Sequence, residues 1–154
     1  METESEAVMK TGPVEKIYEA YSAIADGRVQ IDAQNSSASV QSSDRRKTYS
    51  VRWEGKVYYS DDNATYWQGY AGYPVIAVLM KQGILPLKEE TAALFSGINW
   101  NELNKRFKRD YAEAAASVMK ERGLDTEAIR RETEAILDSL KELDFELRRG
   151  KGKR

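Results

Sequence analysis

The segment KTYSVRWEGKVYYS, residues 47–60, carries the clearest structural pattern in the chain. From Tyr49 to Trp53, apolar or aromatic residues alternate with polar ones, which is the period of a β-strand with one buried face. Glu54-Gly55 is a two-residue turn of the kind that joins antiparallel strands, and KVYYS follows as the second strand. The segment therefore predicts a β-hairpin.

Two further strands are predicted before this hairpin. RVQIDAQ (residues 28–34) alternates in the same way, and a weaker strand follows at residues 38–42. Earlier still, PVEKIYEAYSAIADG (residues 13–27) has apolar residues at helical spacing, with proline at its start and glycine at its end. The pattern predicts a helix followed by an antiparallel meander with one dry face.

Everything after the aromatic segment that follows the hairpin is predicted to be helical. Helices are expected at residues 73–83 and 85–97, and Asn99 with Glu102 can cap a long helix that reaches Gly123. A last helix over residues 125–148 has apolar residues at alternating steps of four and three, which favours lengthwise packing on another helix.

We expect an α+β fold with an antiparallel sheet of four to five strands, helices mainly on one face of it, and a C-terminal helical hairpin. The expected parts are a flexible acidic leader (1–12), an α+β sheet domain (13–98), a helical hairpin packed on it or on a partner (99–149), and a basic tail (150–154). The stripe of the 125–148 helix could also bind a protein partner or a second copy of the chain.

Composition removes several classes of function. The chain has no Cys and no His, which excludes thiol chemistry and the commonest transition-metal ligands. Its 24 basic and 25 acidic residues balance, which argues against indiscriminate nucleic-acid binding. The longest apolar run, residues 75–80, is too short to cross a bilayer, and the acidic N-terminus does not resemble a signal peptide. We expect a cytoplasmic protein without a cofactor.

Oxygen ligands after the hairpin could bind a hard cation. Asp61, Asp62 and Asn63 are the weak candidates for such a metal site. The calcium-loop pattern rejects them, because the positions for Gly and Glu hold Tyr66 and Gly72. A turn stabilised by these side chains is favoured, so we expect no metal and assign no catalytic residue.

Aromatic residues concentrate between residues 49 and 73. Parity requires some of these rings to face away from the core, near two basic side chains, and such a surface can stack bases or dock a partner. The competing interpretation is that Tyr and Trp stabilise strands by pairing across them. The candidate ligand- or partner-binding residues are Arg52, Lys56, Tyr58, Tyr66, Trp67, Tyr70 and Tyr73.

The block from DGRVQI through YSVRW, YYSDDN and YWQGYAGYPVIAVLM to INWNELN resembles a family of small uncharacterised archaeal and bacterial proteins. The resemblance covers about residues 14–110 and implies no activity.

Three hypotheses on function remain open from the sequence. The first is a non-catalytic binding module, a protein-interaction or assembly protein. The second is an accessory protein that binds single-stranded nucleic acid through the aromatic and basic sheet face. The third is a carboxylate- and magnesium-dependent enzyme.

Overall fold

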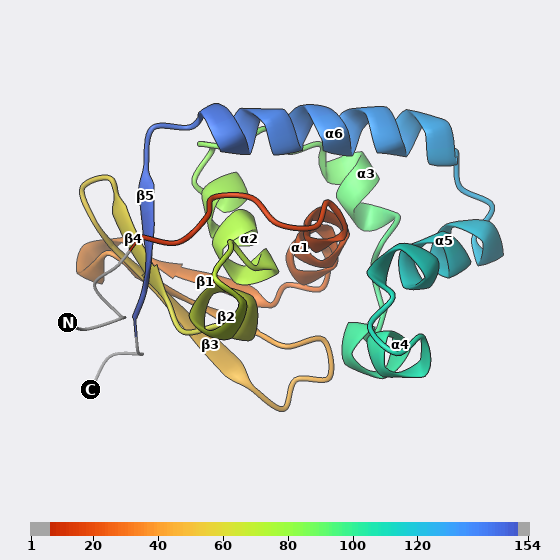
Figure 1. Ribbon diagram of the computed structural model, residues 1–154, viewed down its shortest axis with the longest axis horizontal. Coiled ribbons are helices and arrows are strands. Elements are labelled where there is room, and N and C mark those ends of the chain that lie inside the picture. The colour runs from red at the N-terminus through yellow and green to blue at the C-terminus, as the bar shows by residue number, and fades with distance from the viewer. Residues whose placement is uncertain (1–6, 151–154) are drawn as a thin grey trace.

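The computed structural model describes residues 7–150 (Figure 1). In chain order its elements are α1 (Glu15–Ala25), β1 (Val29–Asp32), the 3-10 helix η2 (Ala33–Asn35), β2 (Ser37–Gln41), β3 (Thr48–Glu54), β4 (Val57–Ser60), the π-helix η3 (Ala64–Gln68), α2 (Tyr73–Lys81), α3 (Glu89–Ala93), α4 (Trp100–Arg106), α5 (Tyr111–Glu121), α6 (Thr126–Glu142) and β5 (Glu146–Arg149).

The five strands form one open sheet in the order β1-β2-β3-β4-β5. The first three pairings are antiparallel and the last, between β4 and β5, is parallel. The predicted α+β fold with a mainly antiparallel sheet is therefore confirmed. The predicted hairpin is β3–β4, but Glu54 pairs with Val57, so the turn residues are Gly55 and Lys56, one position later than expected. Gly55 has a φ of +60°, which glycine adopts without steric cost.

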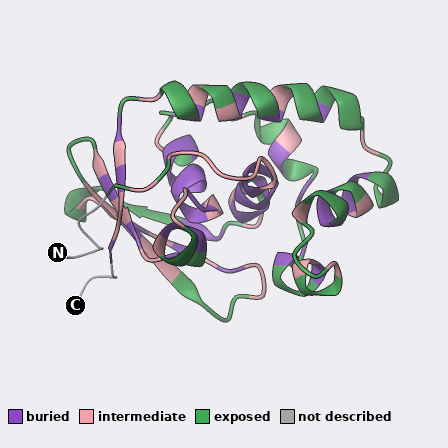
Figure 2. Cartoon of the chain, viewed as in Figure 1, coloured by how far each residue is buried: buried purple, intermediate pink, exposed green. Residues whose placement is uncertain are grey.

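Helices α1 and α2 pack side by side over one face of the sheet, and α6 lies across them on the side away from the sheet (Figure 1). Buried residues concentrate in α1, α2 and the inner faces of the strands, whereas the outer surfaces of α4, α5 and α6 are exposed (Figure 2). All the residues of α1 from Lys16 to Ala23 are buried, because helices and sheet surround it. This burial includes the polar side chains of Lys16 and Glu19.

The prediction of one long helix up to Gly123 is wrong, because the segment forms two helices, α4 and α5. The chain turns between α4 and α5, where Lys108 and Arg109 adopt left-handed backbone conformations with φ of +54° and +67°. Asp110 then caps α5 by accepting a hydrogen bond from the Glu113 backbone N–H at 3.1 Å. A local side-chain cap thus outweighs the continuous helical periodicity of the segment.

Replacing Asp110 with alanine tests this break, because the free energy of unfolding should fall if Asp110 caps α5 and rise if it lies inside a continuous helix. As an N-cap, Asp110 should stabilise the protein by about 1 kcal/mol, so Asp110→Ala lowers the free energy of unfolding measured with urea. In an uninterrupted helix the same change would raise stability by about 0.6 kcal/mol. Asp138→Ala, at an exposed position inside α6, is the matched control and should leave stability equal or slightly higher.

The helix predicted at residues 125–148 is also shorter than expected. It ends at Glu142, and the chain continues as β5, whose pairing with β4 is extended by hydrogen bonds from Glu146 N–H to the Lys56 carbonyl (2.9 Å) and from Gly150 N–H to the Ser60 carbonyl (3.1 Å). Leu147 is fully buried in this strand. The free edge of β4 thus decides the conformation of a segment whose composition favours a helix.

Residues 7–9 of the predicted leader make backbone hydrogen bonds to the rest of the chain. Val8 N–H donates to the Leu147 carbonyl at 2.8 Å, and the backbone of Met9 bonds to Gly69 and Ala71. Residues 7–9 therefore connect the edge of the sheet to the segment after η3. The rest of the predicted leader, residues 1–6, and all but Gly150 of the predicted basic tail lie outside the described residues.

The apolar stripe predicted on the last helix is buried within the chain itself. Ile129, Thr133 and Ile136 are each at most 5% exposed, and Thr133 lies 3.4 Å from the hydroxyl of Tyr18 on α1. A protein partner would therefore have to bind the opposite, charged face of α6. Within residues 7–150, no helix has both the length and the apolar character needed to span a membrane.

Candidate functional site: a charged cavity

A cavity of about 570 Å³ lies between α1, the β2–β3 loop, the π-helix η3 and the helices α4 and α5. Its volume is within the range of small-molecule sites. Its walls are mostly polar and come from Lys16, Glu19, Asp44, Arg46, Lys47, Tyr49, Asp62, Asn63, Ala64, Trp67, Gln68, Tyr73, Asn101, Asn104, Lys105, Arg109 and Tyr111.

A buried ion pair contributes to the cavity wall from α1. The ammonium of Lys16 lies 3.5 Å from a carboxylate oxygen of Glu19 and 4.3 Å from the centre of the Tyr111 ring, a cation–π contact. The amide of Asn104 on α4 donates to the same Glu19 oxygen at 3.4 Å. Both charged side chains are at most 10% exposed, so this pair is held in a fixed arrangement away from bulk water.

The neighbours of this pair set its protonation. Burial lowers the pKa of Lys16, but the negative charge of Glu19 and the nearby tyrosines outweigh it and leave the pKa above its usual value. Lys16 is therefore a cation at neutral pH. Burial raises the pKa of Glu19, although Lys16 and the hydrogen bond from Asn104 oppose this effect. The pair combines a permanent cation with a carboxylate that is harder to ionise than usual.

The pKa of Glu19 predicts a specific pH dependence of stability. An acid with a raised pKa in the folded state binds its proton more tightly there, so its contribution to stability falls as pH rises from about 4 through the raised pKa. We expect Glu19→Gln, which cannot titrate, to lack this contribution. The free energy of unfolding of the wild type minus that of the variant should be larger at pH 5 than at pH 7. If the free energies of unfolding of the two proteins change with pH in parallel, Glu19 ionises as an exposed glutamate does.

Asp62 connects the end of β4 to the π-helix wall. Its carboxylate accepts hydrogen bonds from the hydroxyl of Ser60 and, at 3.1 Å, from the backbone N–H of Thr65. Burial raises the pKa of Asp62, and the hydrogen bonds from Ser60 and Thr65 oppose the shift. Gly72, the residue before α2, packs directly against this carboxylate. Asp62 therefore fixes η3 and the start of α2 relative to each other.

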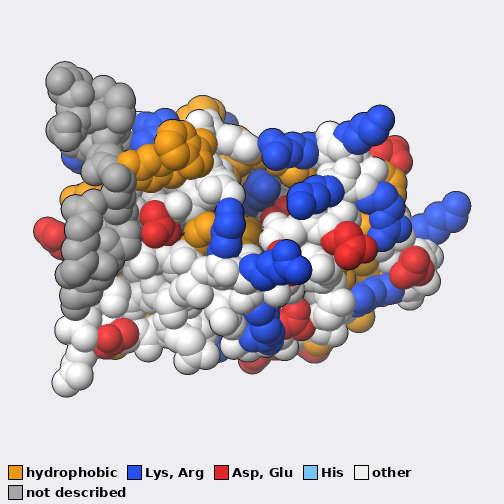
Figure 3. All heavy atoms as spheres, turned by 90° about the horizontal axis from the view of Figure 1, so that it is seen from below, with side chains coloured by type: hydrophobic (Ala, Val, Ile, Leu, Met, Phe, Trp, Pro, Cys, Tyr) orange, Lys and Arg blue, Asp and Glu red, His pale blue; other side chains and the backbone are white. Residues whose placement is uncertain are grey.

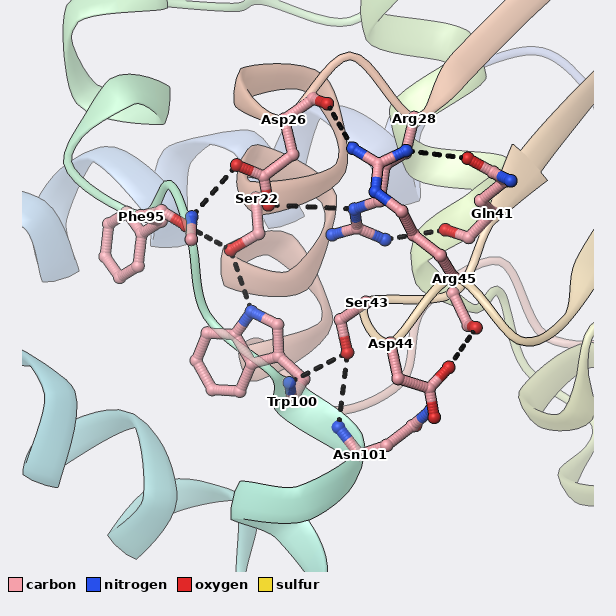
Figure 4. A network of polar contacts seen from close by, with 12 residues as sticks. Ser22, Asp26, Arg28, Gln41, Ser43, Asp44, Arg45, Phe95, Trp100 and Asn101 are labelled. Carbon is pink, nitrogen blue, oxygen red and sulfur yellow. Dashed lines mark hydrogen bonds and ion pairs between the residues drawn. The ribbon is translucent and has the colours of Figure 1, made fainter.

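The β2–β3 loop, residues 42–47, is attached to α4 by a polar network (Figure 4). The Ser43 hydroxyl accepts from the backbone N–H of Trp100 at 2.8 Å, and the Asp44 carboxylate accepts from the Asn101 amide at 3.1 Å. Hydrogen bonds from Ser42, Arg46 and Asn101 hold the pKa of Asp44 well below its usual range. The loop is thus held beside the start of α4.

The same network connects the loop and α4 to the core (Figure 4). The Trp100 indole N–H donates to the Ser22 hydroxyl at 2.8 Å, deep in α1. Arg28, which is 2% exposed, donates to the Gln41 carbonyl at 2.6 Å and lies 3.7 Å from the Asp26 carboxylate. The start of the loop that carries Arg46 and Lys47 is therefore attached both to α4 and to the end of α1, which places the backbone of these cations beside the cavity.

Positive charge dominates the lining. Five of the lining residues are Lys or Arg and three are Asp or Glu. Among residues 7–150, no carboxylate lies within 4.0 Å of the four cations other than Lys16, namely Arg46, Lys47, Lys105 and Arg109. The charge of Arg46 nevertheless helps to lower the pKa of Asp44. The face seen from below, where the β2–β3 loop and α4 lie, has Lys and Arg side chains gathered over its middle and right (Figure 3). The cavity therefore suits an anion.

Two of the predicted site residues, Trp67 and Tyr73, line this cavity. Trp67 is 75% exposed. Tyr73 packs edge-on against Tyr49 at 6.5 Å between ring centres, and burial raises its pKa. Tyr58 instead points into the core, where it is 4% exposed and donates a hydrogen bond to Gln82 at 2.8 Å.

The other predicted site residues do not line the cavity. Arg52 stacks on the ring of Tyr59 at 4.0 Å on the outer sheet face, and Lys56 pairs with Asp144. Tyr66 contacts the ring of Trp67 edge-on, with 5.0 Å between the ring centres. Tyr70 packs on Gly12 and donates to Gln68. The seven candidates thus fall on different surfaces.

The weak metal candidates have protein hydrogen-bond partners. Asp61 accepts from the Ser50 backbone N–H at 2.8 Å, and both Asp62 oxygens are used as described above. Asn63 lines the cavity. Within the described part of the chain, no group of three or more acidic residues is arranged to hold a metal ion.

Sequence reasoning missed the importance of Lys16 and Glu19. A Lys–Glu pair three residues apart is typical of a solvated helix face, and only the surrounding helices bury it here. The basic residues of segment 105–109 lie beside the acids Glu102 and Asp110 in the sequence, which is the composition of an ordinary solvated helix face. Asp110 caps α5 and Glu102 pairs with Arg106, which leaves Lys105 and Arg109 at the cavity.

The fold and the site define an α+β protein with a positively charged cavity beside its sheet. Residues 9–146 match the family described as Uncharacterised conserved protein UCP014422, and the chain belongs to that family. No curated protein and no solved structure matches the chain.

Proposed function

We propose that this protein is a binding module for a small organic anion, held in the charged cavity. The observation that carries the proposal is the set of four cations without carboxylate partners among residues 7–150, placed around a cavity whose wall also contains the buried Lys16. A phosphate or carboxylate is the group that such cations bind best. Amide side chains from Asn63, Gln68 and Asn101 add neutral donors and acceptors beside them.

The contacts favour this function over the three hypotheses that the sequence leaves open. A protein-assembly role through α6 has no free apolar stripe to use, since the stripe is buried in the chain. A nucleic-acid surface on the outer sheet face has Tyr59 beside Arg52, but the backbone of Gly150 packs against the Tyr59 side chain. An enzyme that uses Asp61 and Asp62 would need carboxylates whose oxygens are not already bonded to the protein.

Thermal unfolding in the presence of anions tests the proposal. Inorganic phosphate, pyrophosphate, citrate and adenosine monophosphate should be compared with the neutral compounds glycerol and adenosine. Ligands that bind only the folded state raise the Tm, and a concentration of about 100 times Kd is equivalent to about 2.7 kcal/mol. We expect at least one anion to raise the Tm, with a smaller rise at high salt.

A charge-neutralised variant is the control for this experiment. Arg46→Gln combined with Lys105→Gln removes one cation from each side of the cavity and breaks no ion pair among the described residues. Its own Tm without ligand should stay close to that of the wild type, while the rise with anions should fall. An equal rise in the variant, or no rise with any anion in the wild type, would contradict the proposed function.

A further inference from the structure

Trp67 is the most exposed large hydrophobic side chain among residues 7–150, at 75% exposure. It lies on the π-helix η3 and lines the cavity. A single exposed aromatic residue is ordinary on a protein surface. At 75% exposure, however, the indole of Trp67 contributes little to the packing of the cavity wall, so packing does not explain its position there. Short π-helical segments inside proteins frequently occur at functional sites.

The backbone that carries Trp67 is fixed on both sides. The Tyr66 ring contacts the Trp67 ring at 5.0 Å, and the Tyr66 carbonyl accepts a hydrogen bond from the Arg149 guanidinium at 2.7 Å. Gly69 ends the π-helix with a φ of +81°, and its carbonyl accepts from Met9 N–H at 3.0 Å. The indole is therefore presented on an ordered segment, which lowers the entropy lost when a ring stacks on it.

Polar groups beside Trp67 could contact the edge of such a ring. Asn63 and Gln68 line the same part of the cavity wall, and each carries an amide that both donates and accepts hydrogen bonds. The Oδ1 atom of Asn104 is buried and has no donor within hydrogen-bonding distance among residues 7–150.

We propose that the anion is a nucleoside phosphate whose base stacks on Trp67 and whose phosphate binds the cavity cations. This inference rests on the proposed function and specifies its ligand. An aromatic platform, ring-edge amides and cations without a carboxylate partner within 4.0 Å are the groups that recognise the base and the phosphate of a nucleotide. A free phosphate or a simple carboxylic acid would use only the cations.

The geometry favours a single nucleotide over a nucleic-acid strand. Binders of single strands stack successive bases along a basic groove. Here Trp67 is the one aromatic residue lining the cavity that is more than half exposed among residues 7–150, because Tyr49, Tyr73 and Tyr111 are partly buried. Lys16, which lines the cavity from α1, is 8% exposed, and so lies at its protected end.

Fluorescence and calorimetric titrations test this inference on the intact protein. The probes are adenosine monophosphate, ribose 5-phosphate and inorganic phosphate, with the wild type, Trp67→Ala and the control Trp53→Phe. Trp100 is 3% exposed and Trp53 stacks on Tyr58 at 5.7 Å, so a base that quenches indole emission acts mainly on Trp67. Trp67→Ala changes an exposed side chain and should leave the fold intact.

The wild type and the Trp53 control should bind adenosine monophosphate about 10-fold more tightly than ribose 5-phosphate, with quenching. Trp67→Ala should bind both with the same affinity and lose the quenching. Equal affinities in the wild type, or an unchanged preference in Trp67→Ala, would overturn the nucleotide assignment and leave the anion-binding function standing. Binding of an oligonucleotide but not of the mononucleotide would also overturn it. If none of the three probes binds, the proposed function itself fails.

Discussion

Replacing Gly72 with alanine is expected to lower the free energy of unfolding by about 3 kcal/mol. A Cβ at this position would overlap a carboxylate oxygen of Asp62 and lie 2.8 Å from its Cγ and 3.1 Å from the Cβ of Ala64. Asp62 cannot move away cheaply, because its oxygens accept hydrogen bonds from Ser60 and Thr65 inside the protein. Urea denaturation at neutral pH measures the loss.

Gly123→Ala is the matched control for this substitution. Gly123 has a φ of +64° but an added Cβ would meet no atom within 4 Å, so only the backbone preference is lost, about 1 kcal/mol. In the Asp62→Ala background, Gly72→Ala should cost much less, because the overlapping carboxylate is gone. Equal losses for Gly72 and Gly123, or an undiminished loss in the Asp62→Ala background, would show that Asp62 does not fix this junction.

The second large effect is expected at the buried ion pair. Lys16→Met should lower the free energy of unfolding by about 3 kcal/mol at neutral pH, because it leaves the Glu19 carboxylate buried without its counter-ion. The loss should shrink as pH falls, since burial already raises the pKa of Glu19 and a protonated side chain needs no counter-ion. Urea denaturation at pH 7 and pH 5 measures both effects.

A second substitution separates charge from packing in this pair. Lys16→Met combined with Glu19→Gln removes both charges and keeps an acceptor for the Asn104 amide. We expect the double variant to recover most of the stability, because a buried ion pair replaced by neutral residues of similar shape is often nearly neutral. If the double variant is as unstable as Lys16→Met alone, Lys16 stabilises the protein through the packing of its side chain and not through the charge of its ammonium group.

The local parts of the fold could be predicted from the sequence, because local patterns decide them. The β3–β4 hairpin follows from alternation and a turn signal, and α1 and α2 follow from apolar spacing between proline and glycine. β5 could not be predicted in this way. Leu143 and Leu147 are four residues apart, which fits a helix, and only the unpaired edge of β4 draws the segment into the sheet.

The cavity was beyond sequence reasoning for a different reason. Its walls come from residues 16–19, 44–49, 62–73 and 101–111, which meet only when the helices pack. Trp67 and Tyr73 were among the predicted site residues because of their chemistry, and both line the cavity. Lys16 and Glu19 carry no local sign of burial, since a charged pair on a helix is normally solvated.

The Arg46→Gln/Lys105→Gln variant also permits the most direct test of the cavity as an anion site. Isothermal titration with pyrophosphate should be carried out on the wild type and on this variant at about 20 mM and about 200 mM salt. At low salt we predict binding to the wild type and an affinity at least about 10-fold weaker in the variant, because two of the cations that line the cavity without a carboxylate partner among residues 7–150 are lost. Equal affinities in two proteins of equal stability would contradict anion binding in this cavity.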